Sequence, residues 1–234
     1  MSLITIVAIA VLCQLGFWQI NRAEEKQLKA GLIKKQQQKP LLAIHLDNQY
    51  LLESNQLQYQ TIQLVGYFEQ SKQFYLDNKK HQGKIGYEII TPFRLENSSN
   101  YLLINRGWVA MGKNRNELPI IETPNKRIVL LGTLMRVPQI HYRPGINKPS
   151  EGKEKIWLYL DTEYYSQKTG YTLYPLIMLL DRQSQYGFIR QWPEFIAKSE
   201  VHYAFAMQWF AFAVFFLVTY FYTGIKKIDV LHEK

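Results

Sequence analysis

The residue best placed to do chemistry is His202, at the start of an uncharged apolar stretch over residues 201–225. An ionisable side chain at the edge of such a stretch is costly in a membrane unless it has a role there or reaches water. On a helix, His202 shares a face with Phe205 and Trp209. An imidazole beside flat aromatic rings can ligate a haem iron and pack the porphyrin, because histidine is a common axial haem ligand. The alternative is an interfacial histidine at the end of an aromatic helix, and the residue types leave both open.

A second stripe lies on the first apolar stretch, residues 2–21 and the position after it, where Gln14, Trp18 and Arg22 follow one another at i, i+4 and i+8. If the two stretches form a helical hairpin, this stripe could face His202 and share in binding a cofactor. Arg22 could then bind a haem propionate, since a guanidinium pairs with a carboxylate bidentately. Its alternative role is that of a basic residue flanking a membrane span.

An arginine interrupts one of the most apolar segments of the chain, in the sequence Asn105-Arg106-Gly107-Trp108. In a strand, Arg106 shares its face with Trp108, so it either stacks on that indole or presents its charge at a cleft. We expect Arg106 and Trp108 to contact a partner or cofactor, with a purely structural pairing as the alternative. Gly107 predicts a β-bulge or the close approach of another backbone segment.

The composition excludes several function classes. The chain has a single cysteine, so neither an intrachain disulfide nor a cysteine-based metal site can form. Its five histidines lack the short spacing of zinc enzymes, and no Gly-rich phosphate loop or Gly-x-Ser-x-Gly elbow occurs. The net charge of +9 is spread among acidic residues without a basic helix, which favours lipid headgroups or an acidic partner over nucleic acid. We therefore expect a protein that is not an enzyme and binds no nucleic acid.

The two uncharged stretches are each long enough to cross a bilayer, since about 20 apolar residues span a hydrocarbon core of about 30 Å. The first lacks the basic start and small-residue cleavage site of a secretory signal, so we expect a retained anchor. The predicted organisation is a first transmembrane helix at 1–21, a helical extension and linker at 22–40, an extracytoplasmic strand-rich domain at 41–200, a second transmembrane helix at 201–225 and a cytoplasmic tail at 226–234.

The charges beside the two spans predict the orientation. Two spans place both termini on one side of the membrane, and the Lys226-Lys227 pair indicates that this side is the cytoplasm. Arg22, Lys26 and Lys29 after the first span argue for the reverse, but a central segment this long translocates largely regardless of charge. The sequence shows no Arg-rich amphipathic transit peptide, which favours the plasma membrane of a bacterium, with lipids around both helices.

The central segment carries strand signals. Alternating or apolar runs predict strands at residues 62–68, 74–76, 87–90, 101–109, 128–134 and 174–180. We also expect a turn at 77–78 and one short helix at 161–168, capped by its first or second residue and followed by Gly170. The predicted fold is an α+β membrane protein in which two transmembrane helices flank an antiparallel β-barrel or sandwich with minor helices.

Four motifs, in this order along the chain, resemble the Surfeit locus family of cytochrome c oxidase assembly factors. They are Leu15-Gly-Phe-Trp-Gln-Ile-Asn-Arg22 with Lys26, Gly86-Tyr87 with Thr91-Pro92-Phe93, Asn105-Arg-Gly-Trp-Val109, and His202-Tyr-Ala-Phe-Ala-Met-Gln-Trp-Phe210. The resemblance covers both apolar stretches and most of the segment between them. Val201 and Phe205 stand where the family usually has Asn and Tyr, so a hydrogen bond to the imidazole from these two positions is not expected.

The resemblance implies a role in respiratory-chain biogenesis. Family members are two-span proteins of the mitochondrial inner membrane or bacterial plasma membrane that assist maturation of oxidase subunit I, and bacterial members are regarded as haem a binders. It implies that this chain binds haem a transiently, with His202 as iron ligand, and assists its insertion into subunit I, with haem a synthase as a further partner. The alternative is a membrane scaffold that stabilises nascent subunit I without carrying haem.

Overall fold

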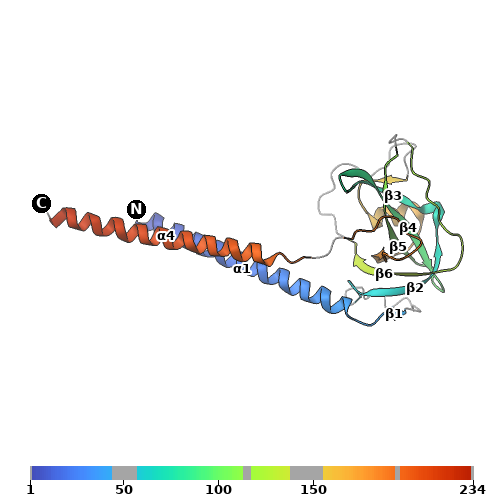
Figure 1. Ribbon diagram of the computed structural model, residues 1–234, viewed down its shortest axis with the longest axis horizontal. Helices are drawn as coiled ribbons and strands as arrows, with labels where there is room; N and C mark the ends of the chain where they lie inside the picture. The colour runs from blue at the N-terminus through green and yellow to red at the C-terminus, as the bar shows by residue number, and fades with distance from the viewer. Residues whose placement is uncertain (1, 44–56, 113–116, 138–154, 193–195, 233–234) are drawn as a thin grey trace. The chain divides into compact units, whose positions relative to one another are not determined.

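The computed structural model describes residues 2–43, 57–112, 117–137, 155–192 and 196–232. Two long helices, α1 (Ser2–Gln37) and α4 (Ser199–His232), supply most of one compact unit. The strands and the short helix α3 (Thr162–Thr169) lie in a second unit (Figure 1). The units comprise Met1–Lys34 with Glu194–Lys234, and Lys35–Pro193.

The first helix extends well beyond its apolar part. α1 continues from the uncharged residues through a charged, Gln-rich segment to Gln37, and Pro40 follows three residues later. This confirms the predicted helical extension, which a proline would end because it disfavours helical backbone at the residue before it. By length and composition, α1 over Leu3–Gln37 and α4 over Ser199–Thr223 can each cross a membrane.

The two helices pack antiparallel within their unit (Figure 1). Phe17 of α1 meets Phe210 of α4 edge to face, with ring centroids 5.3 Å apart. Nearer the other end of the contact, Gln27 Nε2 donates to Ser199 Oγ over 3.2 Å. A Cβ added at Gly16 would lie 2.6 Å from the Phe210 ring. The glycine therefore lets this ring approach the backbone of α1.

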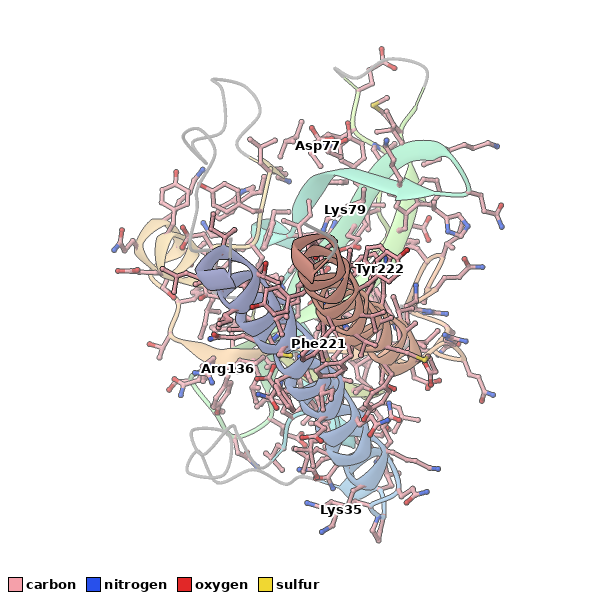
Figure 2. All side chains as sticks on the ribbon, turned by 90° about the vertical axis from the view of Figure 1, so that its left-hand side faces the viewer. Lys35, Asp77, Lys79, Arg136, Phe221 and Tyr222 are labelled. Carbon is pink, nitrogen blue, oxygen red and sulfur yellow. The ribbon has the colours of Figure 1, made fainter. Side chains whose placement is uncertain are left out.

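Much of the remaining surface of α4 is exposed and apolar. Phe221 and Tyr222, near the end of the candidate span, project from the helix surface (Figure 2). The other large exposed apolar side chains after the contact with α1 are Phe212, Val214, Phe215, Phe216, Leu217, Val218 and Tyr220. A continuous apolar surface of this size is typical of a helix that meets another apolar phase.

Within the described residues, the second unit contains one eight-stranded sheet (Figure 1). Its strands are β1 (Leu42–Ala43), β2 (Thr61–Phe68), β3 (Phe74–His81), β4 (Lys84–Leu95), β5 (Tyr101–Ala110), β6 (Ile128–Arg136), β7 (Ile156–Trp157) and β8 (Leu173–Leu180), with a 3₁₀ turn η1 (Gln70–Lys72) before β3. The strand order is β1-β2-β6-β8-β5-β4-β3-β7, and β2 also pairs with β4. This extra pairing closes β2, β6, β8, β5 and β4 into a barrel, to which β3 and β7 are added at β4.

The predicted α+β character and barrel are confirmed, but the barrel is not wholly antiparallel. Three pairs are parallel: β5 with β8, β1 with β2, and β3 with β7. Between β6 and β8 the chain passes through β7 and α3, and a crossover of this kind can return a strand parallel to an earlier one. Alternation along a strand predicts which of its faces is buried but not which strand pairs with it. The sequence therefore did not predict that the sheet is mixed.

The barrel interior is apolar. Along β2, half-buried and buried residues alternate, and Ile62, Leu64 and Phe68 are among the buried ones. They pack in one cluster with side chains from the other barrel strands: Phe93, Leu95, Leu102, Ile104, Ile128, Leu130, Leu134, Tyr174, Leu176, Met178 and Leu180. The period-two alternation that predicted these strands therefore also selects the core residues.

Two local predictions have opposite outcomes. The helix α3 is capped as expected, because the Asp161 side chain accepts from Tyr164 N and Gly170 closes the helix at φ 75°. The turn predicted at 77–78 is wrong, since β3 continues through it to His81. Asn78 instead lies at φ 58°, where the register of β3 against β4 shifts. Asn tolerates left-handed backbone in turns and in bulges alike, so its type did not distinguish them.

Candidate functional site

His202 lies at the contact between α4 and α1. Its Nδ1 is 2.7 Å from Oε1 of Gln19, and its side chain is half-buried. An amide oxygen only accepts, so Nδ1 carries the proton and donates it to Gln19. In the neutral imidazole Nε2 is then the acceptor nitrogen, and it makes no hydrogen bond with the described residues. A hydrogen bond at one ring nitrogen that fixes the tautomer and the ring is the usual state of a metal-binding histidine.

The aromatic neighbours predicted for His202 lie on α4 as expected from the helical spacing. Ala206, one turn after His202, is buried, and Trp209 beyond it is half-buried. The Trp209 ring meets Phe212 edge to face, with centroids 6.1 Å apart. Phe205 is 46% exposed. Both rings are therefore open to a ligand at the surface of the hairpin.

The stripe of Gln14, Trp18 and Arg22 does not face α4, so this expectation is wrong. All three side chains are exposed, Trp18 at 56%, and Arg22 pairs with Glu25 on its own helix over 2.7 Å. The reason is the geometry of the helix, which turns by about 100° per residue, so a single stripe is one of several that α1 offers. The part of these residues in cofactor binding stays a prediction.

The residue that sequence reasoning missed is Gln19. It lies on α1 three residues after Gly16 and four residues before Ala23, and both of these small residues are buried. Small residues repeated along one face mark the side of a membrane helix that packs against another helix. This spacing was the signal that could have placed Gln19, and not Gln14, opposite His202.

Arg106, in β5, is the polar centre of the barrel unit. It is 2% exposed, and its guanidinium makes four hydrogen bonds. Nε donates to Tyr186 O over 2.8 Å and Nη2 to Glu122 O over 2.9 Å. Nη1 donates to Thr123 Oγ1 over 2.6 Å and to Gln73 Oε1 over 3.2 Å. The side chain therefore ties together β5, the end of η1, and two loops that are far apart in the sequence.

Two aromatic rings enclose the same guanidinium. The Cζ of Arg106 lies 4.9 Å from the ring centre of Phe68 and 4.9 Å from that of Phe188, a geometry that favours cation–π attraction. Burial, and to a lesser extent the charge of Arg190, lowers the pKa of Arg106 to about 10. Arg106 is thus still protonated at neutral pH.

Trp108 does not share a face with Arg106, so that prediction is wrong. Glu88 of β4 pairs with Trp108, but Ile90 pairs with Asn105, so β5 carries one extra residue between these pairs. The extra residue is part of a β-bulge, and it turns Trp108 to the side of Asn105. The prediction for Gly107 is confirmed, because it lies in the bulge at φ 110° and a Cβ there would be 2.7 Å from Ile189 O.

The other residues of this motif hold neighbouring strands together. Trp108 Nε1 donates to Lys79 O over 2.9 Å, and Asn105 Nδ2 donates to Glu88 Oε2 over 3.0 Å. The backbone of Trp108 also pairs with Ile189 through N–H to O bonds of 2.7 and 3.1 Å. This pairing brings the loop with Tyr186 and Phe188 against Arg106, so the contacts observed for Trp108 are structural.

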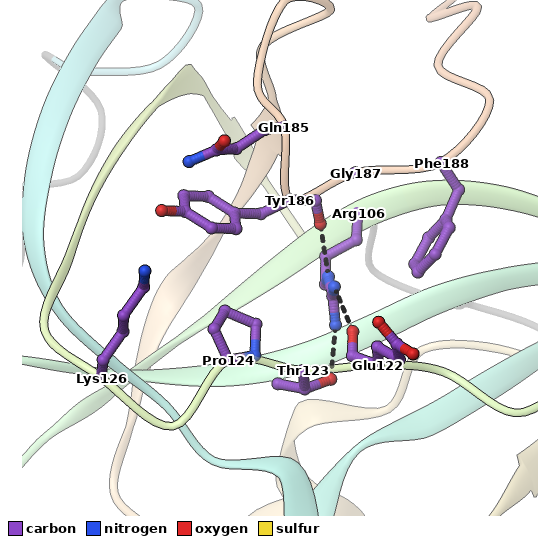
Figure 3. A pocket seen from close by; sticks show the side chains of 9 residues that line it. All are labelled: Arg106, Glu122, Thr123, Pro124, Lys126, Gln185, Tyr186, Gly187 and Phe188. Atoms are coloured by element: carbon purple, nitrogen blue, oxygen red, sulfur yellow. Dashed lines mark hydrogen bonds between the residues drawn. The ribbon is translucent and has the colours of Figure 1, made fainter.

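A pocket of about 490 Å³ opens beside Arg106 (Figure 3). Its lining residues are Arg106, Glu122, Thr123, Pro124, Lys126, Gln185, Tyr186, Gly187 and Phe188. They come from β5 and from the two loops that Arg106 joins. Arg106 lines the pocket although only 2% of it is exposed, and its contact with a partner or cofactor stays a prediction.

Comparison with known proteins assigns the chain to a family. The sequence profile of the SURF1 family matches residues 6–214. The chain belongs to the SURF1 family. SURF1-like proteins of Rickettsia felis and Rickettsia bellii are each 27% identical to it, over 94% of this chain and 94% and 88% of their own lengths. Surfeit locus protein 1 of Takifugu rubripes is 27% identical over 67% of this chain and 69% of that protein.

The SURF1 match spans Gln19, Arg106 and His202. In the described part of this SURF1-family chain, no three His, Cys, Asp or Glu side chains come together in a way that could hold a metal ion. The residues around His202, an imidazole with Phe205 and Trp209 on the same helix, are of the types that a haem site uses.

Proposed function

We propose that this SURF1-family protein is a cytochrome c oxidase assembly factor that binds haem a transiently and assists its insertion into subunit I. The family membership and the motifs that resemble oxidase assembly factors support this role. The expected partners are subunit I and haem a synthase, from which the protein would receive the cofactor. In this role the protein is a carrier and catalyses no reaction.

The observation that carries the proposal is the hydrogen bond from Nδ1 of His202 to Oε1 of Gln19. It fixes the imidazole in the tautomer whose Nε2 can ligate iron, and it holds the ring against rotation. The usual family residues beside the histidine are replaced by Val201 and Phe205. Gln19, from the other helix, supplies the hydrogen bond that these positions lack.

The neighbouring side chains suit a cofactor that must later be released. When bound, haem a would supply an iron that can take an imidazole ligand and a large apolar ring. His202 would hold the iron, and Trp209 and Phe205 would pack on the ring as aromatic neighbours on α4. One protein ligand and apolar contacts give moderate affinity, so subunit I can take up the cofactor.

The apolar helices support a membrane location. We place α1 and α4 across the plasma membrane of a bacterium, in line with their lengths and composition and with the Rickettsia relatives. Both termini lie in the cytoplasm and the barrel unit lies outside, following the lysine pair after the second span. His202 then lies near the outer membrane surface, at the start of α4.

The test is to co-express the full chain with haem a synthesis, purify it in detergent and record its absorption spectrum. The wild type is expected to carry haem a, and His202→Ala to lose most of it, because the iron ligand is gone. His81→Ala is the matched control, since His81 lies in the barrel unit and its loss should leave the haem spectrum unchanged. Circular dichroism checks that each variant keeps its fold.

The second candidate is a scaffold that never holds haem. It is favoured by the same Gln19–His202 contact, because interhelical hydrogen bonds of this kind also stabilise membrane helix pairs. A wild type that is isolated without haem a, yet co-purifies with subunit I, would overturn the carrier and leave the scaffold.

A further inference from the structure

The pocket beside Arg106 has a positive charge that its own surroundings do not neutralise. All four hydrogen bonds of the guanidinium go to uncharged oxygens, namely two backbone carbonyls, a hydroxyl and an amide. Among the ion pairs of the described residues, none involves Arg106. A buried charge without a counterion is costly, and an anion from outside would lower that cost.

Arg106 keeps one N–H that makes no hydrogen bond with the described residues. A guanidinium has five N–H groups, and its Nη2 makes one hydrogen bond, to Glu122 O. One N–H of Nη2 is therefore left for a ligand. Since Arg106 lines the pocket, this N–H is the natural anchor for an oxygen atom bound there.

A second guanidinium lies against the pocket wall. Arg190 donates from Nη2 to Arg182 O over 2.7 Å, but its buried Nε and Nη1 have no hydrogen-bond partner. Its Nη1 packs on Gly187, where a Cβ would overlap it. Arg190 adds to the positive potential of the site, which is also why it lowers the pKa of Arg106.

Three polar side chains lie at the edge of the pocket with ends that are available for hydrogen bonds. Lys126, Gln185 and Tyr186 point to one side of it (Figure 3), and their side-chain ends make no hydrogen bond with other described residues. The ammonium, the amide and the hydroxyl can all donate to an oxygen. Phe188 lies on the other side of Arg106, and Pro124 lies between Lys126 and Thr123 (Figure 3).

The charges of the lining residues select the ligand class. Among the lining residues Arg106 and Lys126 are positive and Glu122 is negative, which leaves one net positive charge at the wall itself, since Arg190 packs on Gly187 without being part of the lining. A carboxylate carries one negative charge, whereas a phosphate near neutral pH carries up to two and would face the Glu122 carboxylate. The aromatic and proline surfaces fit an apolar body attached to the carboxylate.

We propose that this pocket binds a carboxylate group carried by an apolar body, either a small aromatic acid or the C-terminus of a peptide. Arg106 provides the buried charge, Lys126 and Tyr186 bind the carboxylate at the edge, and Phe188 packs on the apolar part. The site lies within the barrel unit and does not depend on His202 or on haem a, so it stands or falls separately from the proposed function.

The experiment is a titration of the ¹⁵N-labelled full chain in detergent, followed through the amide signals of Thr123 and Gly187. Benzoate and N-acetylphenylalanine represent the two carboxylate sources, and benzamide and N-acetylphenylalanine amide are their uncharged counterparts. Both acids, or one of them, are expected to shift the two signals at millimolar concentration, while the amides leave them in place. Tighter binding of N-acetylphenylalanine would indicate a peptide end, and tighter binding of benzoate a small acid.

Variants at the edge of the pocket keep the test independent of folding. Lys126→Ala should weaken binding by about twofold to fivefold, the usual contribution of an exposed ion pair. Lys80→Ala, at an exposed lysine of β3, should leave binding unchanged. Equal binding of acids and amides, equal or tighter binding of inorganic phosphate, or equal effects of the two lysine variants would overturn the proposal.

Discussion

The helical hairpin and the barrel each hold one ionisable side chain among apolar residues, but they hold it differently. In the hairpin, His202 makes one hydrogen bond, to Gln19, and keeps a ring nitrogen without a partner among the described residues. In the barrel, Arg106 makes four hydrogen bonds and lies between two aromatic rings. The histidine thus uses one of its two ring nitrogens in the contact between the helices, whereas the arginine uses four of its donors to hold separate segments of the barrel together.

The difference follows from what each region needs. Two helices satisfy their own backbone hydrogen bonds, so small residues and two polar pairs, Gln19–His202 and Gln27–Ser199, suffice at their contact. The barrel has to fix two irregular loops against β5, and the backbone groups of a loop do not all find hydrogen-bond partners within the loop itself. Arg106 holds both loops in place by donating hydrogen bonds to the backbone carbonyls of Glu122 and Tyr186.

The largest expected effect tests the structural role of Arg106. Arg106→Met keeps much of the volume but removes a donor from four oxygens, of which, among the described residues, only Gln73 Oε1 keeps other side-chain donors, those of Thr91 and Thr123. We therefore expect the barrel to lose about 3–5 kcal/mol of unfolding free energy. Arg94→Met is the control, because Arg94 is exposed and lies 5.3 Å from the Tyr67 ring. It should cost less than about 1 kcal/mol. Urea unfolding followed by near-UV circular dichroism measures both, and equal losses would contradict the role of Arg106.

The bulge is expected to have the next largest effect. Gly107→Ala forces a side chain into φ 110° and against Ile189 O, so we expect a loss of about 2–3 kcal/mol. Gly83→Ala also places alanine at positive φ, 77°, but meets no atom within 4 Å, and should cost about 1 kcal/mol. The same unfolding measurement compares the two. A loss at Gly107 no larger than that at Gly83 would show that the loop with Ile189 can move away at little cost.

Two glutamines of α1 test whether the contact between Gln19 and His202 supports cofactor binding in the hairpin. Gln19→Ala removes the hydrogen bond that orients His202, and should weaken haem a binding by about tenfold, as the loss of such an orienting partner typically does. Gln14→Ala removes an exposed amide from another face of the same helix and should have no effect. Titration of the purified protein with haem a, read by absorbance, gives both affinities. Equal losses would place the cofactor on the face of Gln14.

The smallest effect concerns alkaline pH. Burial, together with the nearby Glu69 carboxylate and Tyr101, raises the pKa of Tyr171 to about 12. Between pH 10 and 12 the unfolded chain releases this proton while the folded barrel keeps it, so the contribution of Tyr171 to stability falls as the pH rises. Arg106 acts in the opposite sense, since its pKa is lowered in the fold.

The contribution of Tyr171 is isolated by a variant. Unfolding free energies of the wild type and Tyr171→Phe, measured from pH 8 to 12, should run in parallel below pH 10, and the wild-type value should fall relative to that of the variant above it. Curves that stay parallel up to pH 12 would mean that Tyr171 ionises normally in the folded barrel.

Much of this protein could be read from patterns that are local in the chain. The lengths and apolar composition of the helices, the extension of α1 to near Pro40, the capped helix α3 and most strands follow from periodicity and capping within a few residues. The position of His202 at the start of an apolar helix was equally visible. Such features depend on neighbours in sequence, so the sequence alone determined them.

The partners of the key side chains were decided only by the tertiary structure. Gln19 and His202 are 183 residues apart, and Arg106 bonds to Tyr186, 80 residues away. The parallel pairing of β5 with β8 and the bulge at Gly107 likewise depend on strands that meet only in the folded barrel. Periodicity states which face of an element is apolar, but several arrangements can bury the same faces. The choice among them rests on packing, close backbone approach and hydrogen-bond satisfaction, which arise between distant segments and leave no local pattern.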